Sequence, residues 1–166
     1  ATGDLIYDPN TENVLPYVSV PEVEDIGEGK KRVVVIDCGT KGNIINSLVK
    51  RKVKVIRVPW NFNPLKEKIK FDAVLVSNGP GDPTMAKETI QTVKDLLKDN
   101  IPTFGICLGS QILCLATGGQ TYKLKFGHRG QNQPVMDVRT KKAIITSQNH
   151  GFAVDMKTMD KNWEEW

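Results

Sequence analysis

The feature that most constrains the fold is the run Val33-Val34-Val35-Ile36, which is followed at once by Asp37. An apolar, β-branched run without polar alternation is typical of a strand buried on both faces, as in a parallel sheet. Further strand-like runs lie at 53–58, 71–77 and 101–106, and helical apolar spacing is found at 43–51, 85–98 and 108–117. Strands that alternate with helices predict an α/β layered sandwich with a mainly parallel central sheet.

Residues 1–30 differ from the rest of the chain in composition. Prolines punctuate this segment, and an acidic stretch with two glycines covers residues 22–29. These features predict an irregular connector, followed by one domain over residues 31–166. After residue 120 we expect only short strands, around 134–138 and 143–147. The length of 166 residues, with 39% hydrophobic and 25% charged residues, fits a single globular domain.

Composition argues against several classes of protein. The net charge is +4, and basic residues are interleaved with acidic ones, whereas a nucleic-acid binder concentrates them on one face. No apolar run approaches the ~20 residues of a membrane span, and the N-terminus does not resemble a signal peptide. Three cysteines without Cys-x-x-Cys spacing argue against a disulfide framework and against a zinc site. We therefore expect reduced thiols and a cytoplasmic protein without nucleic-acid or membrane partners.

Cys107 lies between a short apolar strand and a helix. This position predicts a nucleophile elbow, a tight strand-to-helix turn that exposes the side chain. Gly105 and Gly109 flank it where a larger side chain would block the turn. A helix N-terminus favours the thiolate, and the backbone N–H groups that follow can stabilise an oxyanion. A free cysteine is more often an inert buried residue, which is how we interpret Cys38 and Cys114, but the flanking glycines favour a nucleophile at Cys107.

Two other segments carry polar groups at loops. Residues 78–83 (Asn-Gly-Pro-Gly-Asp-Pro) form a rigid turn whose backbone can approach a ligand, and they lack a phosphate-binding pattern. Residues 147–155 form a polar cluster at the end of a predicted strand and contain His150. The other histidine, His128, lies in a glycine-rich loop. Because the carboxyl ends of parallel strands share one edge of a sheet, we expect residues 78–83 and Cys107 to meet there.

Together these segments resemble the class I (triad) glutamine amidotransferases. Residues 105–111 are similar to the nucleophile motif Gly-x-Cys-x-Gly-x-Gln, and residues 78–83 look like the family's oxyanion loop. Residues 125–135 and 147–155 narrow the resemblance to the glutamine-hydrolysing domain of carbamoyl phosphate synthetases. The resemblance covers the chain from about Arg32 onward and implies a flavodoxin-like fold. Residues preceding it look like the connector from another domain of a small subunit.

The resemblance also implies a chemistry. Cys107 would hydrolyse L-glutamine to glutamate and ammonia through a thioester, with the N–H groups of Gly79 and Leu108 as the oxyanion hole. The ammonia would pass to a synthetase, as a separate large subunit or a fused domain, that uses ATP, magnesium and bicarbonate in pyrimidine or arginine synthesis. This domain itself would need no cofactor and no metal. The glutamine-binding residues would be Gly79, Gly81, Leu108, Gln111, Asn149, Gly151 and Phe152.

The resemblance to the family does not extend to the general base. In this family the catalytic His and Glu belong to a later His-Pro-Glu motif, which residues 1–166 do not contain. We therefore expect a fold that is incomplete at its C-terminus, an intact gene product that is an active glutaminase, and little activity from this segment alone. His150 is expected to shape the glutamine pocket, and His128 to support a loop. Ammonia-using relatives lack the cysteine, so Cys107 favours the glutamine-using form.

Two other functions are compatible with parts of the sequence. A non-catalytic, amidotransferase-like module could dock to or regulate a synthetase, although Cys107 and Gln111 weigh against it. A flavodoxin-like nucleotide-binding domain would fit the alternating strands, but the sequence has no phosphate-binding loop to support it.

Overall fold

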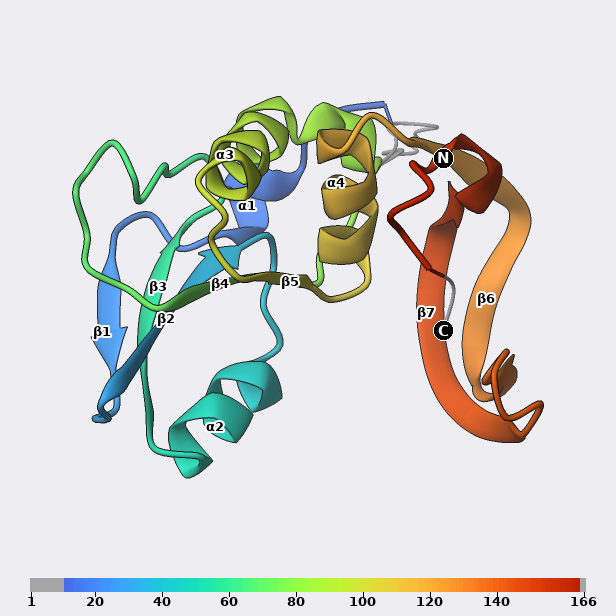
Figure 1. Ribbon diagram of the computed structural model, residues 1–166, viewed down its shortest axis with the longest axis horizontal. Coiled ribbons are helices and arrows are strands. Elements are labelled where there is room, and N and C mark those ends of the chain that lie inside the picture. The colour runs from blue at the N-terminus through green and yellow to red at the C-terminus, as the bar shows by residue number, and fades with distance from the viewer. Residues whose placement is uncertain (1–10, 165–166) are drawn as a thin grey trace, which may run out of the picture.

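The computed structural model describes residues 11–164 of the chain, and its main sheet has five strands (Figure 1). These are β1 (Glu24–Ile26), β2 (Lys31–Asp37), β3 (Val53–Pro59), β4 (Ala73–Val76) and β5 (Thr103–Gly105), in the spatial order β1-β3-β2-β4-β5. β2 pairs in parallel with β3 and β4, and β4 with β5, whereas β1 is antiparallel to β3. The order of the four parallel strands is the flavodoxin-like one, so the predicted fold class is confirmed.

Helices cover both faces of the sheet. Figure 1 shows α3 (Lys87–Lys98) and α4 (Leu108–Ala116) on one side and α2 (Gly42–Lys50) on the other. Alternate residues of β2 point to opposite faces, so Val34 and Ile36 pack beneath α3 and α4 while Val35 packs beneath α2. All three side chains are fully buried. The continuous apolar run of β2 therefore exists because both faces of this strand are covered.

The last part of the chain forms a separate two-stranded antiparallel sheet. β6 (Gln120–Met136) and β7 (Ala143–Asp155) make a long hairpin that stands beyond α4 (Figure 1). The prediction of short strands at 134–138 and 143–147 is wrong in extent. Most of these residues are exposed, so no apolar periodicity marked the strands. The polar cluster at 147–155 consequently lies within β7 and not after a strand.

The connector contains regular structure, contrary to prediction. α1 (Leu15–Val18) and β1 are both ordered elements, while residues 1–10 lie outside the described range. Leu15 is anchored in the main core, and β1 is held at the sheet edge by ion pairs such as Glu24 to Arg57. Of the residues that suggested a linker, Pro16 thus belongs to α1, and Glu24 and Asp25 belong to an edge strand, for which charged side chains are usual.

Two short 3-10 helices complete the structure. η1 (Pro83–Met85) precedes α3, and η2 (Met156–Thr158) follows β7. Within the described residues, no helix has the length and apolar character needed to cross a membrane.

Candidate active site

Cys107 connects β5 to α4 in an unusual backbone conformation. Its φ is 53° and its ψ is −108°, a region that residues other than glycine rarely adopt. A side chain at Gly105 would collide with the backbone of Gly109, and one at Gly109 would collide with the carbonyl of Val76. Both glycines are therefore required by close backbone contacts. The predicted tight strand-to-helix turn is confirmed, with a strained residue at Cys107 and no room for larger flanking residues.

The three cysteines differ strongly in environment, and none is in a disulfide. Cys38 is fully buried; burial, with a smaller contribution from the charge of Asp37, raises the pKa of its thiol to about 12. Burial likewise raises the pKa of the Cys114 thiol. The assignment of both residues to the core is confirmed. Cys107 is partly exposed, which leaves it as the accessible thiol of the chain.

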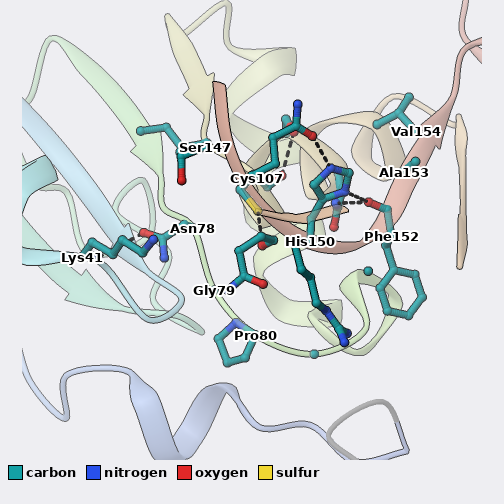
Figure 2. A pocket seen from close by; sticks show the side chains of 18 of the residues that line it. Lys41, Asn78, Gly79, Pro80, Cys107, Ser147, His150, Phe152, Ala153 and Val154 are labelled. Atoms are coloured by element: carbon teal, nitrogen blue, oxygen red, sulfur yellow. Dashed lines mark hydrogen bonds between the residues drawn. The ribbon is translucent and has the colours of Figure 1, made fainter. Parts of the chain in front are cut away.

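A pocket opens in front of Cys107, and its walls come from five segments of the chain, of which Arg129 of β6 contributes one (Figure 2). Lys41 follows β2, residues 78–81 follow β4, Cys107 follows β5, and residues 147–154 belong to β7. The expected meeting of the loops at the carboxyl ends of the parallel strands is thus observed. The predicted residues Gly79, Gly81, Gln111, Asn149, Gly151 and Phe152 all line the pocket, whereas Leu108 does not and has a buried side chain.

Two backbone donors next to Cys107 have no protein acceptor. Within the described part of the chain, neither the N–H of Gly79 nor that of Leu108 donates a hydrogen bond. A side chain at Gly79 would collide with the carbonyl of Cys38 and would lie 2.7 Å from Cδ2 of Leu108. This close packing brings the loops after β2, β4 and β5 together. Two free N–H groups near a cysteine are what an oxyanion hole requires.

Side-chain hydrogen bonds tie the loop after β4 to the loop after β2. The Ser77 hydroxyl accepts a hydrogen bond from the Cys38 N–H at 2.9 Å and donates one to the Asn78 carbonyl at 2.8 Å. The Asn78 amide donates to the Gly39 carbonyl and accepts from the Lys41 N–H, both at 3.1 Å. The position of the Asn78–Gly79 backbone is therefore set by two polar side chains.

A buried carboxylate fixes the loop after β2. Asp37 is fully buried and accepts N–H groups from Val20, Gly39 and Thr40, and its Oδ2 lies 2.8 Å from Nη2 of Arg57. Burial alone would raise the pKa of the Asp37 carboxyl, but the hydrogen bonds outweigh it and hold the pKa below its usual value. The same carboxylate thus joins the N-terminal connector, through Val20, to the loop that supports Gly79.

His150 is engaged by partners other than Cys107. Its Nδ1 lies 2.8 Å from the Phe152 carbonyl (Figure 2). Its Nε2 lies 2.9 Å from Oε1 of Gln148 and 3.1 Å from Nδ1 of His128. The Cys107 sulfur instead lies 4.0 Å from the Asn149 carbonyl. Within residues 11–164, neither histidine is hydrogen-bonded to Cys107. No group of three or more His, Cys, Asp or Glu in the described residues is arranged to hold a metal ion.

Sequence reasoning missed several residues of this site. Lys41, Ser110 and Arg129 line the pocket, and Ser77 and Asp37 position its loops. Ser77 and Asp37 could have been suspected, because each is a polar residue that directly ends an apolar strand run at the carboxyl edge of the sheet. Ser110 lies within the motif at 105–111, three residues after Cys107 on the first turn of α4. The sequence offers no comparable signal for Arg129, whose relation to Cys107 depends on tertiary structure.

Comparison with known proteins identifies a family. The model for class-I glutamine amidotransferases matches residues 34–166. A carbamoyl phosphate synthase small chain of Methanocaldococcus jannaschii is 51% identical over 156 residues, which cover 92% of this chain and 44% of the relative. That of Thermotoga maritima is 54% identical over 133 residues, or 79% of this chain and 34% of the relative. The chain therefore spans less than half the length of these relatives.

A mitochondrial carbamoyl-phosphate synthase [ammonia] of Aquarana catesbeiana is also similar. It is 44% identical over 160 residues, which cover 95% of this chain and 11% of the relative. Among solved structures, a glutamine amidotransferase of Thermotoga maritima has a TM-score of 0.54 at 21% identity, with 75% of this chain and 62% of that chain covered. This likeness supports the fold.

Proposed function

Because this chain belongs to the class I glutamine amidotransferase family, we propose that the protein hydrolyses L-glutamine to glutamate and ammonia, with Cys107 as nucleophile. The observation that carries the proposal is the conformation of Cys107. Its strained turn presents a partly exposed thiol to the pocket, next to the free N–H groups of Gly79 and Leu108. Backbone strain of this kind persists where the surrounding structure enforces it, which is common at active sites.

The reaction proceeds in two steps. The Cys107 thiolate attacks the side-chain carboxamide carbon of glutamine, and the tetrahedral oxyanion accepts hydrogen bonds from the N–H groups of Gly79 and Leu108. The carbon–nitrogen bond breaks, the nitrogen takes up a proton and ammonia leaves, so that a γ-glutamyl thioester remains on the sulfur. Water then adds to the thioester carbon, and the carbon–sulfur bond breaks to give glutamate and the free thiol.

Glutamine is held by the surrounding pocket wall in this proposal. Gln111 contributes from α4, and its Nε2 donates to the Phe152 carbonyl at 2.8 Å, which links the nucleophile helix to β7. The Nδ1–H of His150 donates to the same Phe152 carbonyl, and the ring shapes the pocket. With both ring nitrogens engaged elsewhere, His150 is not assigned as the base. The other binding residues are Gly79, Gly81, Leu108, Asn149, Gly151 and Phe152.

The names of the relatives suggest where the ammonia goes. We propose that it is delivered to a synthetase, as a partner subunit or a fused domain, which makes carbamoyl phosphate with ATP, magnesium and bicarbonate. The attack on glutamine and the stabilisation of the oxyanion described above use only side chains and backbone of the chain, and the proposed chemistry needs no cofactor. A cytoplasmic location fits an enzyme that depends on a reduced thiol.

Labelling with a glutamine-analogue electrophile tests the proposed function. The full-length protein is incubated with 6-diazo-5-oxo-L-norleucine, and modified peptides are identified by mass spectrometry. We expect one adduct, on Cys107, that forms more slowly when L-glutamine is added, together with glutamate release that the Cys107→Ala variant lacks. A non-catalytic docking module would give no glutamine-protected adduct, and labelling confined to other residues would contradict the proposal.

A further inference from the structure

The Asn78–Gly79 peptide bond carries the oxyanion donor that lies in the loop after β4. A peptide group is planar and trans, so its C=O and its N–H point in opposite directions. Any group that fixes the direction of the Asn78 carbonyl therefore fixes the direction of the Gly79 N–H. The Ser77 hydroxyl donates to that carbonyl at 2.8 Å. Ser77 is thus connected to the oxyanion donor through a single rigid peptide plane.

The Ser77 hydroxyl is itself held in place. It is fully buried and accepts the N–H of Cys38 at 2.9 Å, so its proton is directed to the Asn78 carbonyl. The carbonyl of Cys38, in the loop after β2, is in close contact with Gly79. The hydroxyl therefore transmits the position of the loop after β2 to the peptide that carries the Gly79 N–H. Water is excluded, so no solvent molecule can replace this bond without a rearrangement.

We propose that Ser77 is a positioning residue that orients the Gly79 N–H toward the oxyanion, an inference that rests on the proposed glutaminase function. Ser77 does not contact the substrate, since its side chain is buried behind the pocket wall. The oxyanion exists in the transition state and the tetrahedral intermediate and not in bound glutamine. Loss of the hydroxyl should therefore lower kcat and leave KM nearly unchanged.

An ordinary structural hydrogen bond would behave differently, and the chain offers a matched control. The Ser19 hydroxyl accepts the Trp60 N–H at 2.9 Å and lies 3.3 Å from the Val20 carbonyl. It thus has the same pattern of one backbone donor and one adjacent carbonyl as Ser77, but it does not touch the Asn78–Gly79 peptide. Ser19→Ala and Ser77→Ala remove hydroxyls with the same hydrogen-bond pattern, although Ser19 is half-buried and Ser77 is buried. Both variants should lower the melting temperature, while Ser77→Ala alone lowers kcat.

The experiment compares the wild type, Ser77→Ala, Ser77→Cys and Ser19→Ala in the full-length protein. Glutamate release gives kcat and KM, and thermal denaturation gives stability. For Ser77→Ala we expect kcat to fall about 10-fold, less than the ~100-fold or greater loss when an oxyanion donor is deleted, with KM changed by less than about 2-fold. Ser77→Cys keeps a weak donor in a similar volume and should lie between Ser77→Ala and the wild type. It also serves if Ser77→Ala does not fold.

A second readout follows the oxyanion itself. Glutamate γ-semialdehyde adds to the Cys107 thiol, so that a carbon–sulfur bond forms and the aldehyde oxygen becomes a tetrahedral alkoxide or hydroxyl. Its inhibition constant should rise in Ser77→Ala by about the same factor as kcat falls. Unchanged kcat and inhibition constant in folded Ser77 variants, or equal kcat losses in Ser19→Ala, would overturn the inference. A wild type that releases no glutamate would instead overturn the proposed function.

Discussion

Cys107 is where the chain stores backbone strain. Its φ of 53° and ψ of −108° cost on the order of 1–3 kcal/mol for a residue with a side chain. The surrounding contacts enforce this conformation. The Cys107 carbonyl accepts hydrogen bonds from the Ser110 N–H at 3.0 Å, the Gln111 N–H at 3.2 Å and the Ser110 hydroxyl at 2.7 Å. The first turn of α4 therefore holds the nucleophile in a conformation that an isolated peptide would avoid.

Replacing the nucleophile by glycine should stabilise the protein. Glycine adopts positive φ without steric cost, so Cys107→Gly relieves the strain and raises the free energy of unfolding. Part of this increase is offset, because a glycine gives the unfolded chain more conformational entropy. We expect a net increase of about 1 kcal/mol in the free energy of unfolding, together with complete loss of glutamate release. Chemical denaturation of the wild type and the variant measures this difference.

The control for this substitution is Cys107→Ala, which removes the thiol and keeps a β-carbon. The alanine variant retains the strain and should be no more stable than the wild type, apart from the small loss of sulfur contacts. Equal stability of the glycine and alanine variants would show that the turn is not strained at Cys107.

At the scale of elements, Asp37 joins the end of β2 to the N-terminal connector. The hydrogen bonds of Gly39, Thr40 and Val20 favour its charged form and lower its pKa in the folded state. A carboxyl whose folded pKa lies below its unfolded value stabilises the fold above the unfolded pKa and loses that contribution as the pH falls through the folded pKa. The Asp37 contribution is therefore present at neutral pH and is lost below about pH 4.

Asp37→Asn should remove this contribution and leave Arg57 without its buried counter-ion. We expect a loss of about 2–4 kcal/mol in the free energy of unfolding at pH 7. The difference between variant and wild type should begin to shrink as the pH falls below about 4, where the carboxyl of the unfolded chain binds a proton, and should be lost once the pH has fallen through the lower folded pKa. Denaturation curves at several pH values from about 7 down to about 3 measure the onset of this change.

Asp72 provides a comparison for this prediction. Its carboxylate bonds the Arg32 N–H at 2.8 Å and the Lys31 ammonium at 3.0 Å, and these bonds lower its pKa, but the side chain is exposed. Asp72→Asn should cost much less than Asp37→Asn at pH 7, since exposed ion pairs contribute little. Equal losses for the two variants would contradict the role of Asp37 as a buried link between elements.

The elements of the main sheet were predictable because burial on both faces leaves a clear apolar signal. The run at 33–36 and the helical spacing of 85–98 identified β2 and α3 with small errors at their ends. The hairpin left no such signal in the sequence, because 9 of the 13 residues of β7 are polar or half-buried and follow no regular pattern. The length of β7 is set by its backbone pairing with β6. β1 lies in an acidic stretch and is not fully buried, so it too left no apolar signal in the sequence.

The site was predictable as far as it consists of local motifs. Cys107 and residues 78–83 are marked in the sequence by glycines, and close backbone contacts in the structure require Gly79, Gly105 and Gly109. The support of the site was not predictable in this way. Ser77, 30 positions before Cys107 in the sequence, acts through a peptide plane whose orientation exists only in the folded chain.

At the scale of the whole molecule, the pocket is assembled from two parts of the chain that differ in burial. One wall belongs to the loops of the main sheet, whose strands are buried, and the other to β7 of the hairpin. The far end of the hairpin is solvated: Ile144 and Ile145 are 62% and 67% exposed. The end of the hairpin that lies near α4 is held by the buried side chain of Phe152 and by the hydrogen bond from the Gln111 amide to the Phe152 carbonyl. Few buried contacts mean that the hairpin opens at a lower free energy than the sheet.

A ligand that fills the pocket should therefore stabilise the hairpin more than the sheet. A glutamine analogue attached to Cys107 would contact both walls of the pocket. It would lose its contacts with β7 when the hairpin moves away, so it favours the arrangement in which β7 lies against the main sheet loops. Hydrogen exchange followed by mass spectrometry should show slower exchange in residues 147–154 after labelling with 6-diazo-5-oxo-L-norleucine. Residues 33–36 are already protected in the core and should not change. The matched control is the iodoacetamide adduct of Cys107. It also lies beside β7, because the Cys107 sulfur is 4.0 Å from the Asn149 carbonyl, but it lacks the amino acid moiety of the glutamine analogue. Equal protection by both adducts would show that the glutamate moiety does not hold the hairpin, and protection spread evenly over the main sheet would mean that the two walls of the pocket open as one unit.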